Sequence, residues 1–236
     1  EFGGAVTVSL PYTPEPSVRS GDYDLLTVYS VNGGGSLQEI KGARFNPATG
    51  AMLFATTHFS RFVVSEWISP FTDTAKEDWF YRAVRYSRSN GLISGTGENT
   101  FSPKTNLTRA MLVTILAREA GAVTSAGDTW YSGSVDWGVA NGITDGANMT
   151  DDITREEFAV ILCRYAKLRG RDVSQTADLA GYADAGEVSG WAVEAVGWAN
   201  ATGLLSGRTE TTLVPGGAAT RAEAAAILQR FIESGA

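Results

Sequence analysis

Three short stretches decide the fold of this chain: Thr108–Met111 (TRAM), Thr154–Glu157 (TREE) and Thr220–Glu223 (TRAE). Each begins an apolar run with helical spacing, and each follows a segment that contains a Trp and a Gly-x-x-x-Gly phrase. A unit that recurs in this way indicates an array of repeats in which neighbouring copies share one core. Because the array puts an Arg at three equivalent helix starts, these arginines are the first candidates for function.

The repeats stay in register over several landmarks. An offset of 51 residues (130 − 79) relates Trp79 to Trp130, and one of 112 (191 − 79) relates Trp79 to Trp191. The second repeat departs from the offset of 51 only in its loop. Arg155 follows Arg109 by 46 residues, so five residues are missing there. The same offsets relate two sets of glycines, which are Gly91, Gly142 and Gly203, and Gly95, Gly146 and Gly207.

Each repeat predicts two helices joined by a loop. The first helix is expected to carry the Trp and to end near Gly91, Gly142 or Gly203, where glycine favours a left-handed cap. The second follows the Thr-Arg phrase and has apolar residues at i, i+3 and i+4. One such hairpin cannot bury its apolar stripe alone, so we expect three of them to form a pseudo-threefold bundle. The fold class predicted for the chain is mainly α.

The N-terminal region, residues 1–67, has β-strand patterns instead. They predict four or five antiparallel strands, which is short for a whole sandwich. The expected strands lie within 5–10, 25–31, 52–56 and 59–64, and the expected turns within 32–35 and 46–50. The domains expected are this β-rich region, residues 1–67, and three repeats, residues 68–125, 126–178 and 179–236. Because the chain begins inside a β-like pattern, we expect it to be part of a longer exported protein.

Composition excludes several classes of function. The 236 residues carry a net charge of −7, which disfavours non-specific binding to nucleic acid. One cysteine, Cys163, and one histidine, His58, permit neither an internal disulfide nor a Cys/His metal cluster. Cys163 lies in an apolar run and is expected to be a buried small hydrophobe. No run reaches the roughly 18 apolar residues of a membrane span, so no membrane insertion is expected.

Thr and Glu in the repeated phrase are explained by helix capping. Thr accepts a hydrogen bond from a backbone amide of the first turn, and a Glu three residues later reaches back to the amide of the Thr. The second and third repeats have both residues, whereas the first has Met111 in place of Glu. We therefore expect a weaker cap in the first repeat.

Arg is not explained by capping, because the first turn of a helix is the positive end of its dipole. Arg109, Arg155 and Arg221 can pair with carboxylates of the fold such as Asp73 or Asp184. They can instead bind an anion, since free backbone amides, the helix dipole and a guanidinium together suit a carboxylate or phosphate. The residues alone do not decide between pairing with a carboxylate of the fold and binding of an anion.

The repeats resemble the S-layer homology domain of bacterial cell-surface proteins. That family has an aromatic-x-Asp phrase, a Trp, a Gly-x-[Leu/Ile/Val]-x-Gly-like phrase, Phe-x-Pro and Ile-Thr-Arg-Ala-Glu. The first repeat carries Phe71-Thr72-Asp73, Gly91–Gly95, Phe101-Ser102-Pro103 and Leu107–Ala110; the third carries Tyr182-Ala183-Asp184, Gly203–Gly207, Leu213-Val214-Pro215 and Thr220–Glu223. The second matches at Trp130, Gly142–Gly146 and Ile153–Glu157 but lacks the aromatic-x-Asp and the Pro loop. The short stretch 56–64 also resembles the last strand of β-domains that precede such repeats.

The resemblance implies a non-catalytic, cofactor-free module that anchors a protein outside the cell, at the bacterial wall or S-layer. The implied ligand is secondary cell wall polysaccharide, typically through a terminal pyruvylated N-acetylmannosamine held in grooves between repeats. In this resemblance the Arg guanidinium binds the pyruvate carboxylate, and the Trp ring packs against the sugar ring. Packing in the core of the repeat also explains each Trp. The glycines of the second set either let amides approach the ligand or serve turn geometry. The candidate ligand-binding residues are Arg109, Arg155, Arg221, Trp79, Trp130, Trp191, Gly95, Gly146, Gly207, Asp73 and Asp184.

Two further expectations follow. The shortened loop of the second repeat, residues 145–152, puts acid beside Arg155, so we expect unequal grooves with one or two of three functional. Other surface-layer proteins are possible partners, and the alternatives to glycan anchoring are a structural role in S-layer assembly and a non-catalytic appendage of a surface glycoside hydrolase. The acidic loop alone is not a two-carboxylate glycosidase site.

Overall fold

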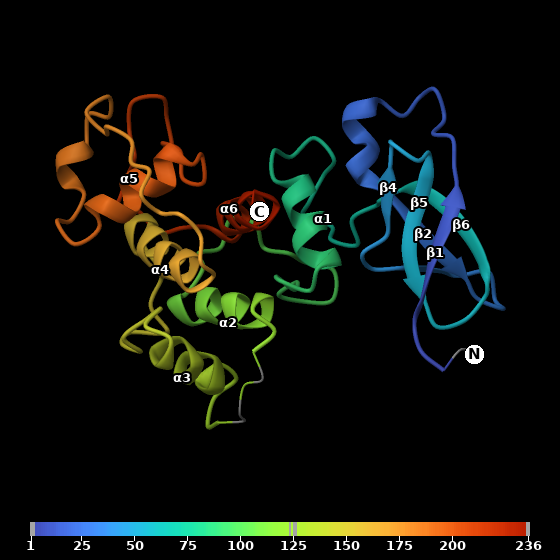
Figure 1. Ribbon diagram of the computed structural model, residues 1–236, viewed down its shortest axis with the longest axis horizontal. Coiled ribbons are helices and arrows are strands. Elements are labelled where there is room, and N and C mark those ends of the chain that lie inside the picture. Colours follow the sequence, from blue (N-terminus) through green and yellow to red (C-terminus); the bar gives the residue numbers. More distant parts are fainter. Residues whose placement is uncertain (1–2, 123, 125–126, 235–236) are drawn as a thin grey trace. The chain divides into compact units, whose positions relative to one another are not determined.

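The computed structural model describes residues 3–122, 124 and 127–234. The chain forms two compact units, Glu1–Phe101 and Ser102–Ala236. Figure 1 shows the strands in the first unit and most of the helices in the second. This division falls inside the first repeat, so the boundaries 67/68, 125/126 and 178/179 stay predictions from the sequence. None of the described helices is both long and apolar enough to cross a membrane.

The β-rich region contains two small antiparallel sheets. One has the order β1 (Val6–Pro11), β5 (Ala51–Thr56), β4 (Arg44–Asn46), and the other has the order β3 (Leu37–Glu39), β2 (Leu26–Val31), β6 (Arg61–Glu66). The four predicted strands and both turns are confirmed. The short strands β3 and β4 and the 3-10 helix Ser20–Leu25 were not predicted. The core contains Leu26, Val28, Ala43, Met52 and Phe54.

The first helix of the first repeat, α1 (Tyr81–Ser89), belongs to the same compact unit as the β-rich region. Arg82 pairs with Asp22 and Asp24, and Arg85 donates to the carbonyl oxygen of Leu26 at 2.7 Å. The Tyr81 hydroxyl donates to the carbonyl oxygen of Trp67 at 2.9 Å. These contacts explain why the unit extends beyond residue 67.

The second unit contains the remaining five α-helices of the described residues. They are α2 (Arg109–Glu119), α3 (Ser132–Ala140), α4 (Arg155–Leu168), α5 (Val193–Ala201) and α6 (Arg221–Glu233). Helix α2 packs against α3, and α4 packs against α5, so a second helix contacts the first helix of the next repeat. Figure 1 shows both pairs, in green and in yellow to orange.

A closed ring of backbone hydrogen bonds relates the three second helices. The amide of Leu107 donates to the carbonyl oxygen of Ala219 at 2.8 Å, that of Ala219 to Ile153 at 2.9 Å, and that of Ile153 to Leu107 at 2.8 Å. All three residues are at most 1% exposed. Each lies two residues before the first residue of α2, α4 or α6, so the ring is the centre of the predicted pseudo-threefold arrangement.

The description "mainly α" was too strong for the whole chain. Helices account for less than half of it, because the strands occupy much of residues 6–66 and the loops of the repeats are long. The repeats themselves are helical as predicted, and the small antiparallel β region is present. Cys163 is buried on α4, and burial raises the pKa of its thiol.

Candidate functional site

The helix starts at Arg109, Arg155 and Arg221 have no free amides in their first turns. The amide of each Arg donates to a loop carbonyl of another repeat: Arg109 to Asp151 at 3.1 Å, Arg155 to Gly217 at 2.9 Å and Arg221 to Thr105 at 2.9 Å. The next amide donates to Met149, Pro215 or Pro103 in the same three loops. The third donates to the Thr hydroxyl. The expectation that free amides bind an anion here was therefore wrong, and only the guanidinium groups remain for that role.

The Thr caps are present in all three repeats. Thr154–Glu157 and Thr220–Glu223 form complete capping boxes, in which the Glu side chain accepts from the amide of the Thr. Thr108 accepts only from the amide of Met111 at 3.3 Å. The predicted difference between the first cap and the other two is confirmed.

Arg155 is a structural residue in this geometry. Its side chain is 5% exposed and donates from Nε to the carbonyl oxygen of Leu213 at 2.9 Å and from Nη2 to that of Ser206 at 2.5 Å. Its Nη1 lies 3.5 Å from Oε1 of Glu223. Burial lowers the pKa of Arg155. Burial also opposes ionisation of Glu223, but hydrogen bonds from Arg208 and the Thr220 amide lower the pKa of Glu223 overall.

Arg109 is placed differently from the other two arginines. Its side chain is 18% exposed, whereas that of Arg155 is 5% exposed. Arg221 is 5% exposed as a whole residue. Nη1 of Arg109 lies 2.8 Å from Oε1 of Glu157. Nε of Arg109 is buried and makes no hydrogen bond within the described residues. The guanidinium is therefore held at one edge while another part of it stays accessible.

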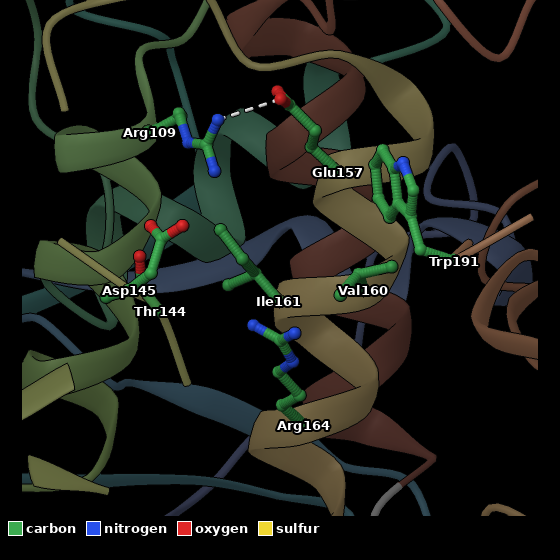
Figure 2. A pocket seen from close by; sticks show the side chains of 8 residues that line it. All are labelled: Arg109, Thr144, Asp145, Glu157, Val160, Ile161, Arg164 and Trp191. Atoms are coloured by element: carbon green, nitrogen blue, oxygen red, sulfur yellow. Dashed lines mark hydrogen bonds and ion pairs between the residues drawn. The ribbon is translucent and has the colours of Figure 1, made fainter. Parts of the chain in front are cut away.

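A pocket of about 310 Å³ lies in front of Arg109, wholly inside the second unit. Figure 2 shows Arg109 and Asp145 on one side of the pocket, Glu157 and Trp191 on the other, and Arg164 below them. Residues of all three repeats therefore contribute to it. Its lining residues are Arg109, Thr144, Asp145, Glu157, Val160, Ile161, Arg164 and Trp191.

The three tryptophans chosen as candidate ligand-binding residues do not belong to the core. Trp79, Trp130 and Trp191 are 65%, 63% and 62% exposed and lie two residues before α1, α3 and α5 rather than inside them. The interpretation of these residues as core packing was wrong. Trp191 lines the pocket with Arg109, so an aromatic side chain and a guanidinium face the same space.

Asp73 and Asp184 each hold a loop through backbone amides, and Asp184 also interacts electrostatically with Arg155, as proposed from the sequence. Asp73 accepts from the amide of Phe101 at 2.8 Å. Asp184 accepts from the amides of Leu213 at 2.8 Å and Val214 at 2.7 Å, and these bonds lower the pKa of Asp184. Val214 has a φ of 53°, a strained value for a β-branched residue, so the carboxylate stabilises an unusual backbone. The guanidinium groups of Arg109 and Arg155 form ion pairs with Glu157 and Glu223.

The glycines serve close packing. A Cβ on Gly95 would lie 2.6 Å from the carbonyl oxygen of Thr100, and one on Gly207 would lie 2.3 Å from that of Thr209. Gly146 has a φ of 79°, and its amide donates to the Thr144 hydroxyl at 3.3 Å. The amide of Gly146 is thus used within the loop. Gly91, Gly142 and Gly203 have φ values of 67–70° and directly follow the C-cap residues of their helices, so the predicted left-handed caps are confirmed.

The acidic loop of the second repeat contacts Arg109 rather than Arg155. Asp145 lines the pocket of Arg109, and the carbonyl oxygen of Asp151 accepts from the Arg109 amide. The side chain of Arg155 contacts the loop of the third repeat instead. Sequence proximity was misleading here because each helix start is covered by the loop of another repeat.

A second recurrent Arg was missed by sequence reasoning. Arg118, Arg164 and Arg230 each lie nine residues after the Arg of the repeated phrase. Arg230 donates to the carbonyl oxygens of Gly203 at 2.9 Å and Leu204 at 3.0 Å, and Arg164 approaches that of Ile143 at 3.4 Å. The constant spacing could have revealed this set. Arg164 also lines the pocket.

Comparison with known proteins agrees with this architecture. Residues 70–110 and 181–225 match the S-layer homology domain. The first match includes Trp79 and the Thr-Arg phrase as far as Ala110. The second includes Trp191 and the whole phrase Thr220–Glu223. The second repeat lies between them and has the same order of Trp, helix, Gly loop, Thr cap and helix.

Several curated proteins resemble the chain. An amylopullulanase of Thermoanaerobacterium thermosulfurigenes is 27% identical over 98% of this chain and 13% of its own length. The surface-layer 125 kDa protein of Lysinibacillus sphaericus is 31% identical over 64% of this chain and 14% of its own length. An endoglucanase of Bacillus sp. (strain KSM-635) is 26% identical over 69% of this chain. The chain spans less than a fifth of each relative. The two matched segments of the chain, residues 70–110 and 181–225, are S-layer homology domains, which supports a cell-surface anchoring module.

Proposed function

We propose that the chain anchors a larger protein to the cell wall by binding secondary cell wall polysaccharide in the pocket of Arg109. The observation that carries this proposal is the joint presence of the Arg109 guanidinium and the exposed Trp191 in one pocket. A guanidinium binds a carboxylate through two parallel hydrogen bonds, and an indole face packs against the apolar face of a sugar ring. A terminal sugar that carries a carboxylate has both features.

Pyruvylated N-acetylmannosamine is the ligand that this proposal favours, since its pyruvate ketal presents a carboxylate on a sugar ring. The pocket of about 310 Å³ suits a terminal sugar rather than a long glycan segment. Glu157 holds Arg109 by one nitrogen, so the guanidinium is oriented before the ligand arrives. Such pre-organisation reduces the entropic cost of binding.

Glycan of two kinds tests the proposal. Calorimetric titration with purified pyruvylated wall polysaccharide should show saturable binding, and the same polysaccharide after removal of pyruvate should bind at least tenfold more weakly. Equal affinity for the two preparations would contradict the role assigned to the carboxylate. Absence of binding to either would refute the anchoring function.

A second candidate function is a non-catalytic appendage of a surface glycoside hydrolase. The match to the amylopullulanase extends over 98% of this chain, including its β-rich region. In this case the module holds an enzyme at the wall, and the binding pocket is the same. Assembly with other surface-layer proteins is a third possibility that the similarity to a surface-layer protein favours. Ordered sheets formed by the purified chain without polysaccharide would support it.

A further inference from the structure

The second repeat differs from the other two at one position of the pocket wall. Asp145 precedes Gly146 in the Gly-x-x-x-Gly phrase, where the first repeat has Ser94 and the third has Ser206. Figure 2 shows the Asp145 carboxylate in the pocket, on the side of Arg109 and opposite Trp191. A carboxylate beside a guanidinium that is expected to hold an anion repels that anion. Its presence is explained by the hydrogen-bonding groups of the pocket.

The pocket is rich in donors and poor in acceptors. Arg109, Arg164 and the indole of Trp191 can only donate. The Thr144 hydroxyl already accepts from the amide of Gly146. Glu157 accepts from Arg109 through Oε1 and from the Thr154 amide at 2.9 Å through Oε2. Each of these acceptor oxygens therefore already has one donor from the protein.

Asp145 supplies a further acceptor. Its Oδ1 accepts from the amide of Ala147 at 3.0 Å, which fixes the side chain on its own loop. Its Oδ2 makes no hydrogen bond to any of the residues that the structure describes. A sugar brings several hydroxyl or amide donors, and a donor that loses water without gaining an acceptor costs free energy.

We propose that Asp145 is a specificity-determining residue that accepts a hydrogen bond from a hydroxyl or amide N–H of the bound sugar. The inference rests on the proposed function of the pocket. It assigns the ligand class as a sugar with a hydrogen-bond donor close to its single carboxylate. Asp145 then improves binding although it has the same charge as the ligand. If it only repels, its removal must strengthen binding.

The test uses the methyl glycoside of pyruvylated N-acetylmannosamine and the methyl ester of the same compound. Asp145→Ser introduces the residue of the other two repeats, and its hydroxyl can still accept from Ala147. This variant should bind both compounds about tenfold more weakly than the wild type, because a hydrogen bond to a charged acceptor is lost. Asp145→Asn keeps a neutral acceptor and should lose about threefold.

The matched control is Asp136→Ser, which removes the same charge from the exposed face of α3 outside the pocket. Its affinities should equal those of the wild type. Unchanged or tighter binding of the acid by Asp145→Ser would overturn the inference, since repulsion or no contact would then describe Asp145. Failure of the wild type itself to bind the acid would instead refute the proposed function.

Discussion

Nη1 of Arg109 lies 2.8 Å from Oε1 of Glu157, and Oε2 of the same carboxylate accepts from the amide of Thr154. One Glu therefore completes the helix cap of the second repeat and orients the Arg of the first. Glu223 has the same two roles for Thr220 and Arg155, although Arg155 is buried and contacts it at 3.5 Å. The repeated phrase thus links neighbouring repeats, and Arg109 combines this link with an open pocket within the second unit.

Arg155→Ala should destabilise the fold. It removes two hydrogen bonds to the carbonyl oxygens of Leu213 and Ser206 in a nearly buried position. Unpaired buried acceptors and the lost charge pair should cost about 2–4 kcal/mol in the free energy of unfolding. Urea denaturation monitored by circular dichroism measures this. Arg208→Ala, which removes a more exposed partner of Glu223, should cost under about 1 kcal/mol and serves as the comparison. Similar costs for both variants would contradict a buried structural role of Arg155.

Gly207→Ala should also be destabilising, because the added Cβ would lie 2.3 Å from the carbonyl oxygen of Thr209 and 2.7 Å from that of Thr212. Overpacking of this kind costs about 1–3 kcal/mol. The control is Gly216→Ala, where a Cβ would meet no atom within 4 Å. The urea midpoint should fall for the first variant and stay within error for the second. Equal midpoints would show that the loop relaxes without cost.

Asp184 should make the fold sensitive to acid. Amide hydrogen bonds from Leu213 and Val214 lower its pKa in the folded state. A group with a lowered folded pKa contributes stability above its unfolded pKa of about 3.9 and loses that contribution as pH falls through the folded value. Asp184→Asn should therefore be less stable than the wild type at pH 7, with the difference shrinking below about pH 4.

Thermal unfolding of both proteins across this pH range measures the effect. Asp136→Asn, a change on the exposed face of α3, should keep the acid sensitivity of the wild type. A stability difference between Asp184→Asn and the wild type that is constant with pH would contradict the assigned role of the carboxylate.

Local features of the fold were predictable from the sequence. The Thr caps, the missing capping Glu at Met111, the left-handed glycines and the hairpin turns depend on a few adjacent residues, so propensity and spacing suffice. The threefold arrangement was also predictable because three stripes of similar spacing need one shared core. Strands β3 and β4 were missed because each has three residues and is defined by its pairing.

The candidate site was predicted only in part. Arg109 and Trp191 were both chosen, but the sequence could not show that they line one pocket or that Arg155 is buried. Free amides at the helix starts were wrongly expected, since the loops that cover them come from other repeats. For the same reason, the loop of Asp145 was expected beside Arg155, whereas Asp145 lies in the pocket of Arg109. Each of these errors concerns contacts between segments far apart in the chain.

The central claim is that Arg109 binds the carboxylate of a wall sugar. Calorimetric titration of Arg109→Ala with pyruvylated wall polysaccharide tests it most directly, against Arg118→Ala, which removes the same charge from an exposed position near the other end of α2. The account predicts a 10- to 100-fold loss of affinity for Arg109→Ala, the value of about one charged hydrogen bond or somewhat more, and no change for Arg118→Ala. Unchanged affinity in a folded Arg109→Ala protein would contradict the account.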